Sequence, residues 1–400
     1  MRVPLSLYVH WPYCSFLCRF CAFSKARVPA KGVEHERITA ALIKELQTSL
    51  AAHKGKVLQS IYFGGGTPSL AQPWHIAQII ETANSLVPLA DDAEITLESN
   101  PTSAEVDKMR DFKQAGVTRY SIGIQTLNDR TLQRMGRLHT GAEGLAAVDR
   151  AKSLFPGRVS FDMIFGFEGQ TLSQWRHELE TVLDHADGHI SVYQLTVEPG
   201  TPLFRDRNAQ RVMLPGDDLQ AQMYESTVDL CTAKGFRHYE VSNYAASAGA
   251  ESMHNKGYWQ GRQWVGIGPS AHSRFVDPIT NKQVSSVRLP DIQRWAQHCE
   301  QFGHGTAKTA VISDADAKQE AVVFGLRMLD GLTDRRFSAV SGGQSLKEYL
   351  RMDQVQQYVG DGYLLWNSAD AHLAPTERGL EVIDSILVDI VPDPGPAELV

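Results

Sequence analysis

Strand-like and helix-like segments alternate along the first 240 residues of this 400-residue chain, and this alternation restricts the fold more than any other feature. Short runs rich in β-branched and aromatic residues predict strands at 5–11, 58–63, 93–98, 119–124, 159–165 and 189–196. Helical periodicity predicts helices between them, at 34–53, 74–86, 104–115, in turns up to 154, and at 172–185. Strands that alternate with helices form a parallel sheet, open or closed into a barrel, with ligands at the carboxyl ends of the strands. The chain is therefore predicted to be an α/β protein whose site follows the strands.

The pattern changes in the second half, and a chain of this length is expected to hold about two domains. We predict a core barrel at 1–240, a connecting segment at 241–300, and a small, mostly helical C-terminal domain at 301–400. A hairpin-like stretch at 363–373 and a last helix at 376–390 fall in the third part. Hydrophobic residues make up 42% and charged residues 21%, which excludes a disordered or collagen-like chain.

The net charge of -7 comes from the end of the chain. Residues 301–400 hold 8 Lys and Arg against 15 Asp and Glu, whereas residues 1–300 hold 31 of each. Because an acidic domain repels the phosphate backbone, the sequence does not favour nucleic acid as a partner.

Three cysteines, Cys14, Cys18 and Cys21, follow the first predicted strand in a C-x3-C-x2-C arrangement. Thiolates at such short spacing can hold a metal cluster in one loop. A structural zinc ion would need a fourth ligand, and the next candidate, His35, lies along a predicted helix. Three ligands fit a 4Fe-4S cluster, in which they bind three irons and leave the fourth open. We therefore predict these cysteines as the metal ligands.

The remaining cysteines, Cys231 and Cys299, lie in helical stretches, and we interpret both as packing residues. An odd number of cysteines without a disulfide framework suits a reducing compartment, so we expect a cytoplasmic protein. No apolar run approaches the roughly 20 residues that a membrane span needs, and the first residues lead directly into a predicted strand. We expect no signal or transit peptide.

Glycines that follow one predicted strand and carboxylates that lie within two others also suggest a ligand-binding site. The glycines at 64–66 follow the second predicted strand, where the lack of a Cβ lets a ligand approach the backbone, although a glycine triplet alone is more often a turn. Glu98 and Asp162 lie in apolar strand segments, and burying them is costly unless they are paired or bonded to a ligand. A structural ion pair with Arg137 is the alternative to a ligand.

The cysteine spacing resembles that of the radical S-adenosylmethionine (SAM) superfamily. This resemblance implies an incomplete parallel (β/α)6 barrel, in which the open iron binds the methionine end of SAM and electron transfer releases a 5'-deoxyadenosyl radical. Over nearly the whole chain, the sequence is similar to the branch that contains oxygen-independent coproporphyrinogen III oxidase and the HemW-type haem chaperones. By this resemblance, Tyr8 and Phe20 flank the cluster and its SAM. The other residues of the implied SAM pocket are Gly65, Gly66, Thr67, Glu98, Gln125, Arg137 and Asp162.

Two features separate the oxidase from the chaperones. The oxidase carries a fourth cysteine two places after the third and an extension before its cluster, whereas here that place is Phe23 and only 13 residues precede Cys14. The chaperones carry an H-N-x-x-Y-W signature, which matches His254, Tyr258 and Trp259 with their neighbours. An imidazole can ligate haem iron, and Tyr and Trp offer flat apolar faces to a porphyrin. A lone His beside aromatic residues is, however, more often a packing residue.

The sequence departs from the chaperone pattern around this signature. Met253 stands where the chaperones commonly have Arg, and 270–273 reads Ser-Ala-His-Ser in place of a Gly-Ala-His-Gly turn. We take His254 as the expected haem ligand and His272 as the reserve.

These features predict a haem chaperone with a 4Fe-4S cluster and SAM, whose partners are haem and haem-dependent recipient proteins. The alternatives are oxidative decarboxylation of coproporphyrinogen III and radical chemistry on another tetrapyrrole, including haem opening. Transient contacts with membrane-bound recipients and a homodimer are both compatible with the chaperone interpretation. No catalytic residue is assigned.

Overall fold

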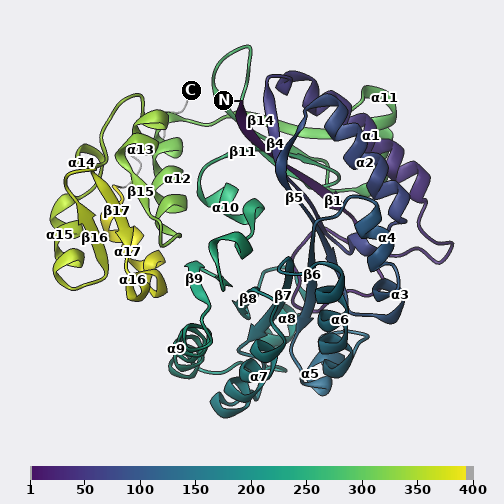
Figure 1. The fold of residues 1–400 in the computed structure, drawn as a ribbon, viewed down its shortest axis with the longest axis horizontal. Helices are drawn as coiled ribbons and strands as arrows, with labels where there is room; N and C mark the ends of the chain where they lie inside the picture. The colour runs from purple at the N-terminus through teal and green to yellow at the C-terminus, as the bar shows by residue number, and fades with distance from the viewer. Residues whose placement is uncertain (1, 393–400) are drawn as a thin grey trace.

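The computed structural model describes residues 2–392 and is dominated by one curved sheet (Figure 1). The strands of this sheet, in chain order, are β1 (Val3–Trp11), β4 (Lys56–Gly65), β5 (Leu89–Ser99), β6 (Arg119–Gln125), β7 (Val159–Phe165), β8 (His189–Gln194), β9 (Arg237–Glu240), β10 (Asn243–Ala245), β11 (Gln263–Ile267), β12 (His272–Val276), β13 (Gln283–Arg288) and β14 (Thr306–Val311). Their spatial order is β14-β13-β12-β11-β1-β4-β5-β6-β7-β8-β10-β9. The stretch from β11 to β8 is parallel throughout, and the strands outside it are antiparallel. The predicted parallel sheet is confirmed, and because its two edge strands do not pair, the barrel is incomplete.

The helices that connect the parallel strands lie along the outer side of the curve (Figure 1). They are α1 (His35–Leu50), α2 (Pro73–Leu86), α3 (Ser103–Val106), α4 (Met109–Gln114), α5 (Asp129–Arg134), α6 (Gly141–Leu154) and α7 (Leu172–His185), whereas α8 (Pro202–Asn208) and α9 (Asp217–Ala233) follow β8 and lead to β9. The stretch predicted as one helix at 104–115 is two helices. Glu105 of α3 is buried, and its carboxylate accepts hydrogen bonds from Ser69 and from the backbone of Asn100.

Alternation along each strand separates an apolar side from a polar side. In β6, Tyr120, Ile122 and Ile124 are fully buried in the core that the helices cover. Arg119 and Ser121, which alternate with them, face the other side and line a cavity inside the curve. Because side chains of a strand point alternately to opposite faces, this pattern gives the sheet an apolar outer face and a polar lumen.

The sequence suggested a separate connecting segment at 241–300, but these residues are part of the large sheet and its helices. They contribute β10, α10 (Met253–Trp259), β11, β12, β13 and α11 (Ile292–Phe302), and β14 continues the same sheet to Val311. The strands here have three to six residues and mix polar with apolar side chains. Each strand is therefore too short for an alternating pattern to be recognised in the sequence.

A second, smaller core follows this sheet and contains Val322, Phe337 and Ile386 among its buried residues. It is built from α12 (Asp314–Leu326), β15 (Leu332–Thr333), α13 (Asp334–Ser341), α14 (Leu346–Tyr349), α15 (Met352–Gly360), β16 (Leu364–Asn367), β17 (His372–Pro375), α16 (Glu377–Glu381) and α17 (Ile383–Ile390). The change of core therefore falls after Val311, later than the predicted start at 301. The predicted hairpin is β16 and β17, and the predicted last helix is divided at Val382 into α16 and α17.

The C-terminal domain packs on the edge of the large sheet. The backbone N–H of Val241 donates to the carbonyl of Arg327 at 3.2 Å, and the N–H of Leu329 donates to the carbonyl of Tyr239 at 3.2 Å. These bonds satisfy backbone groups beside β9, the edge strand.

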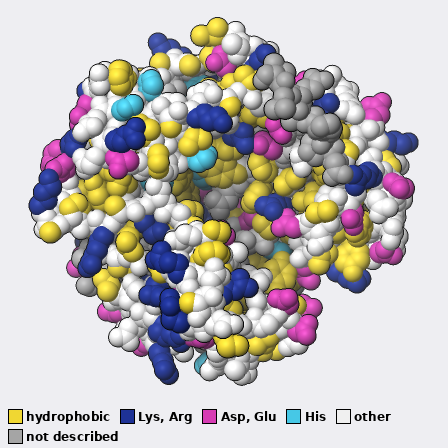
Figure 2. Space-filling view, turned by 180° about the vertical axis from the view of Figure 1, so that it is seen from behind, with side chains coloured by type: hydrophobic (Ala, Val, Ile, Leu, Met, Phe, Trp, Pro, Cys, Tyr) yellow, Lys and Arg dark blue, Asp and Glu magenta, His cyan; other side chains and the backbone are white. Residues whose placement is uncertain are grey.

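The surface seen from behind in Figure 2 is hollowed near its middle, with hydrophobic side chains around the hollow. Within residues 2–392, no helix is long and apolar enough to cross a membrane.

Candidate functional site

The three cysteines lie on one loop that follows β1 and is fastened at both ends. The short strands β2 (Tyr13–Cys14) and β3 (Ala26–Arg27) pair with each other, and the N–H of Val28 donates to the carbonyl of Cys14 at 2.9 Å. In the middle of the loop, the N–H of Arg19 donates to the carbonyl of Met135 at 3.1 Å. The loop is thus held in place by backbone bonds, and it projects all three thiols to one side.

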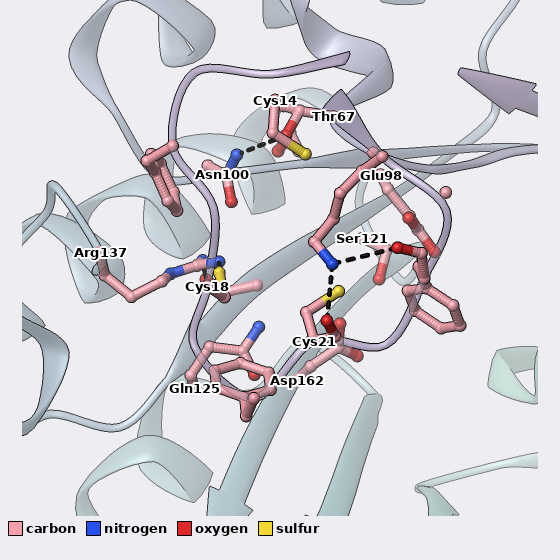
Figure 3. A pocket seen from close by; sticks show the side chains of 18 residues that line it. Cys14, Cys18, Cys21, Thr67, Glu98, Asn100, Ser121, Gln125, Arg137 and Asp162 are labelled. Atoms are coloured by element: carbon pink, nitrogen blue, oxygen red, sulfur yellow. Dashed lines mark hydrogen bonds between the residues drawn. The ribbon is translucent and has the colours of Figure 1, made fainter. Parts of the chain in front are cut away.

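All three thiols line one cavity of about 150 Å³, shown in Figure 3. No three His, Cys, Asp or Glu side chains among the described residues converge as ligands of a single metal ion. Three thiols that line one cavity fit a multi-iron cluster, in which each thiolate binds a different iron. Burial raises the pKa of the Cys14 thiol to about 11, and a hydrogen bond from Thr67 partly opposes this shift.

The glycines at the end of β4 bring that strand against the cysteine loop. The N–H of Gly66 donates to the carbonyl of Trp11 at 2.7 Å, and the N–H of Thr67 donates to the carbonyl of Tyr13 at 2.8 Å. A Cβ on Gly66 would lie 2.7 Å from the Tyr13 oxygen and 2.8 Å from the Trp11 oxygen. Gly65 has a φ of +100°, which only glycine adopts readily. These glycines therefore allow contact within the protein, besides any contact with a ligand.

Two partly buried carboxylates, Glu98 and Asp162, face the cysteines across the cavity. Burial raises the pKa of Glu98 to about 7, and the Tyr62 hydroxyl, which donates to Glu98 at 2.7 Å, opposes the shift. Burial raises the pKa of Asp162 to about 6, against a hydrogen bond from Ser191 and the charge of Arg137. Within the described part of the chain, no ion pair joins either carboxylate to a basic side chain. Both groups are therefore suited to a ligand that brings a positive charge or hydrogen-bond donors.

Arg137 contacts the cysteine loop instead of these carboxylates. Its Nη1 donates to Sγ of Cys18 at 3.4 Å, and its Nη2 donates to the carbonyl of Gly123. The guanidinium lies 5.1 Å from the ring centre of Phe16 on the same loop. Its Nε is buried and has no partner among residues 2–392. The alternative of a structural ion pair is therefore wrong, and a donor is left for a ligand.

Gln125 ends β6 with a φ of +75°, in the left-handed region that non-glycine residues rarely adopt. The pairing of β6 with β7 shifts between Gly123 and Gln125. Strained backbone of this kind costs about 1–3 kcal/mol and persists mainly at functional sites. The side chain lines the cavity of the cysteines.

A second cavity, of about 670 Å³, continues from the first into the lumen of the sheet. Phe20, Cys21 and Phe23 of the cysteine loop line both cavities, and so do Glu98 and Asp162. The side chain of Phe23 is 67% exposed at this junction. The lumen is large enough for a ligand of drug or cofactor size.

Several residues of these cavities were missed from the sequence. They are Lys25, Asn100 and Ser121 beside the cysteines, and Arg119, Ser160, His189, Ser191, Tyr193 and Asn255 in the lumen. Most stand at alternate positions of the predicted strands, so polar residues that alternate with apolar ones could have indicated a polar lumen.

The segment that matches the chaperone signature is mainly structural here. His254 is 1% exposed, and both its ring nitrogens are bonded, Nδ1 to the Ser60 hydroxyl at 2.9 Å and Nε2 to the Tyr258 hydroxyl at 3.0 Å. Burial lowers the pKa of His254 to about 3, so it is neutral. Trp259 packs on Phe324 of the C-terminal domain. With no free nitrogen, His254 is not available as an iron ligand in this structure.

Two more predicted residues also lie away from the cavities. Tyr8 packs on Tyr62, its hydroxyl bonds to Nδ1 of His10 at 3.1 Å, and it lines neither cavity. His272 is exposed at the start of β12 and lines neither cavity. Asn255 of the signature segment reaches the lumen instead, together with Ser252 just before the segment.

Comparison with known proteins gives two family matches. Residues 8–182 match the radical SAM superfamily, and residues 312–382 match the HemN C-terminal domain. The second match begins just after β14, where the structure changes core.

The chain is similar to curated proteins over most of its length. It is 40% identical to radical S-adenosyl methionine domain-containing protein 1, mitochondrial, of Danio rerio, over 97% of this chain and 87% of the relative. It is 36% identical to the haem chaperone HemW of Escherichia coli, over 96% and 97% of the two chains. Coproporphyrinogen III oxidase (HemN) from Escherichia coli shares the fold, with a TM-score of 0.81 at 19% identity over 97% of this chain and 90% of that chain.

Proposed function

The chain belongs to the radical SAM superfamily and, within it, to the family that contains the haem chaperone HemW, and from this membership we propose that it binds haem and passes it to haem-dependent proteins. The observation that carries the proposal is the cysteine cavity, which opens into a lumen of about 670 Å³. The proposed cofactor site is thus directly connected to a cavity that can hold a larger molecule, and several residues line both.

We propose that Cys14, Cys18 and Cys21 hold a 4Fe-4S cluster and that SAM lies between this cluster and Glu98. Three thiols on one loop fit these two groups, and so do two groups that lack a partner among residues 2–392, the partly buried carboxylate of Glu98, which has no ion pair, and Nε of Arg137. When bound, they would supply one-electron reduction of a sulfonium and a 5'-deoxyadenosyl radical. The chain itself supplies the position of the thiols and a carboxylate for the positively charged methionine end.

Gly65, Gly66, Thr67, Gln125 and Asp162 complete the proposed SAM pocket, with Phe20 beside the cluster. Thr67 is positioned by Asn100, whose side-chain amide donates to its hydroxyl at 3.0 Å. Gly66 acts through the cysteine loop, because its N–H holds the Trp11 carbonyl.

Binding of SAM is expected to weaken on acidification because a proton on Glu98 competes with the positively charged ligand. Below the Glu98 pKa of about 7, affinity should fall by up to about tenfold per pH unit. Equilibrium dialysis of SAM from about pH 8 to about pH 5 would measure this slope.

The raised pKa of Glu98 also affects stability. Because the folded protein holds this proton more tightly than the unfolded chain, the ligand-free protein becomes less stable as pH rises from about 4.5 through about 7.

The matched control is Glu98→Gln, which cannot titrate. Its affinity should be lower at neutral pH and should change little until the pH approaches about 6, where Asp162 is half protonated. An unchanged slope in this variant would exclude Glu98 from the SAM pocket.

The chaperone is favoured over the oxidase by Phe23 and by the remaining cysteines. Phe23 stands where the oxidase has its fourth cysteine, and Cys231 and Cys299 are fully buried in α9 and α11. We therefore propose that haem is held without being consumed. We also propose the lumen, in place of His254 and His272, as the place where haem contacts the protein.

Anaerobic incubation of the reconstituted protein with SAM, a reductant and either haem or coproporphyrinogen tests this proposal. We expect haem to be recovered intact with the protein and coproporphyrinogen to stay unchanged. Production of protoporphyrinogen with matching cleavage of SAM would show that the protein is an oxidase and not a chaperone. A ring-opened product from haem would indicate radical chemistry on haem itself. A Cys18→Ala protein serves as the cluster-free control.

We propose a reducing compartment such as the cytoplasm, because all five cysteines are free thiols. Haem-dependent recipient proteins, some of them membrane-bound, and a second copy of the chain are the proposed partners. Size-exclusion chromatography with and without haem would show whether a homodimer forms.

A further inference from the structure

The lumen has opposite charge at its two ends. Glu98 is the last residue but one of β5, beside the cysteine loop, and Asp162 lies near it. Arg119 and His189 are the first residues of β6 and β8, so they lie at the opposite end, here called the lumen floor. Because parallel strands all run from the floor towards the cysteines, carboxylates line one end of the cavity and basic side chains line the other.

Arg119 is the charged group of the floor, and it shares its carboxylate partner with a second arginine. The buried carboxylate of Glu94 is shared by two guanidinium groups, those of Arg119 at 3.4 Å and Arg158 at 3.6 Å. Arg119 also donates to the Ser160 hydroxyl at 3.1 Å and to the carbonyl of Ala250 at 2.7 Å. Since a guanidinium has five N–H donors and three have partners here, two remain. Arg158 is 42% exposed and does not line the cavity, so solvent screens its charge, and an anion in the lumen would accept from the two remaining donors of Arg119.

His189 lines the same floor with a ring nitrogen that has no partner. The side chain is 2% exposed, and its Nε2 lies 2.9 Å from the Tyr239 hydroxyl. This hydroxyl already accepts the backbone N–H of Ser252 at 3.1 Å, so its own proton is best placed on the bond to Nε2. The proton of the neutral imidazole is then on Nδ1, which is buried and unpartnered among residues 2–392. An unsatisfied buried donor is costly, which points to a ligand that accepts from it.

We propose that the lumen floor binds a carboxylate of the ligand, which for haem is a propionate. Arg119 supplies the charge and Nδ1–H of His189 supplies a hydrogen bond, while the carboxylates of Glu98 and Asp162 repel the same group at the other end. The ligand is therefore oriented with its carboxylate away from the cysteines. The nature of the carboxylate rests on the proposed haem binding, whereas the anion site itself rests on the floor alone.

Haem and haem dimethyl ester, which has no free carboxylate, are the two probes for this site. We expect the unmodified protein to bind haem about tenfold more tightly than the ester, and His189→Leu to reduce this preference to about twofold. The absorbance change on titration measures both affinities, and no variant is needed for the first comparison. His238→Leu is the matched control, because His238 is equally buried nearby, on β9, but lines neither cavity.

The outcomes separate this site from the proposed function. If neither haem nor its ester binds, haem binding itself is wrong. If both bind with equal affinity to the unmodified protein, haem binding stands and the floor site is wrong. A preference that His189→Leu and His238→Leu reduce equally would also overturn the assignment, because the loss would then reflect general destabilisation. Arg119→Lys, which keeps the charge, should retain part of the preference.

Discussion

Replacing Cys18 by Ala is expected to abolish iron–sulfur absorbance after anaerobic reconstitution, the largest effect anticipated for any single side chain. Cys14, Cys18 and Cys21 line one cavity, and Arg137 donates to the Cys18 sulfur. With one of three thiolates missing, one iron would lose its only protein ligand. Iron content and the visible spectrum of the reconstituted protein measure the effect.

Cys231→Ala provides the control for this experiment. Cys231 is fully buried in α9, where burial raises the pKa of its thiol above that of an exposed cysteine, so it stays protonated. Its replacement should leave iron content unchanged. A Cys18→Ala protein with full iron content would contradict the assignment of the three ligands.

Replacing Gly66 by Val is expected to remove both cluster assembly and SAM binding. Even a Cβ at this position would lie 2.7 Å and 2.8 Å from the carbonyl oxygens of Tyr13 and Trp11, which belong to the cysteine loop and the strand before it. Backbone atoms cannot give way as a flexible side chain can, so the loop must move. Iron content after reconstitution and SAM affinity by equilibrium dialysis are measured on the same preparation.

Gly55→Val, just before β4, is the matched control, because nothing lies within 4 Å of a Cβ there. This variant should keep both the cluster and SAM binding. A Gly66→Val protein that assembled the full cluster but lost SAM would mean that Gly66 contacts the ligand and not the cysteine loop. Retention of both properties would contradict any role for this glycine.

The arrangement of the core barrel could be predicted from the sequence because it depends on local patterns. All six predicted strands are present in the structure, and the three cysteines lie after the first of them on one loop. Glu98, Gln125 and Asp162 were placed in or at the end of strands, and the structure brings all three to the cysteine cavity. Parallel strands end at the same edge, so residues after different strands meet there without further information.

The role of the signature segment could not be predicted in this way. His254 is bonded to Ser60, which lies 194 residues earlier in the chain. The motif alone led us to expect His254 as the haem ligand, whereas its hydrogen bonds show that it is a buried structural residue. For the same reason Gly66 was interpreted as a contact for a ligand, although its nearest neighbours are carbonyls of the cysteine loop.

The sequence by itself determined the backbone plan, namely the alternation of strands and helices, the loop of three thiols, and the carboxylates within strands. Spacing and periodicity carry this information because each depends on residues close together in the chain. Only the tertiary structure decided which polar groups are left without a partner, such as Nε of Arg137 and Nδ1 of His189. Whether a buried donor is satisfied depends on atoms from distant strands and loops, and an unsatisfied group suggests a ligand only where its side chain also lines a cavity.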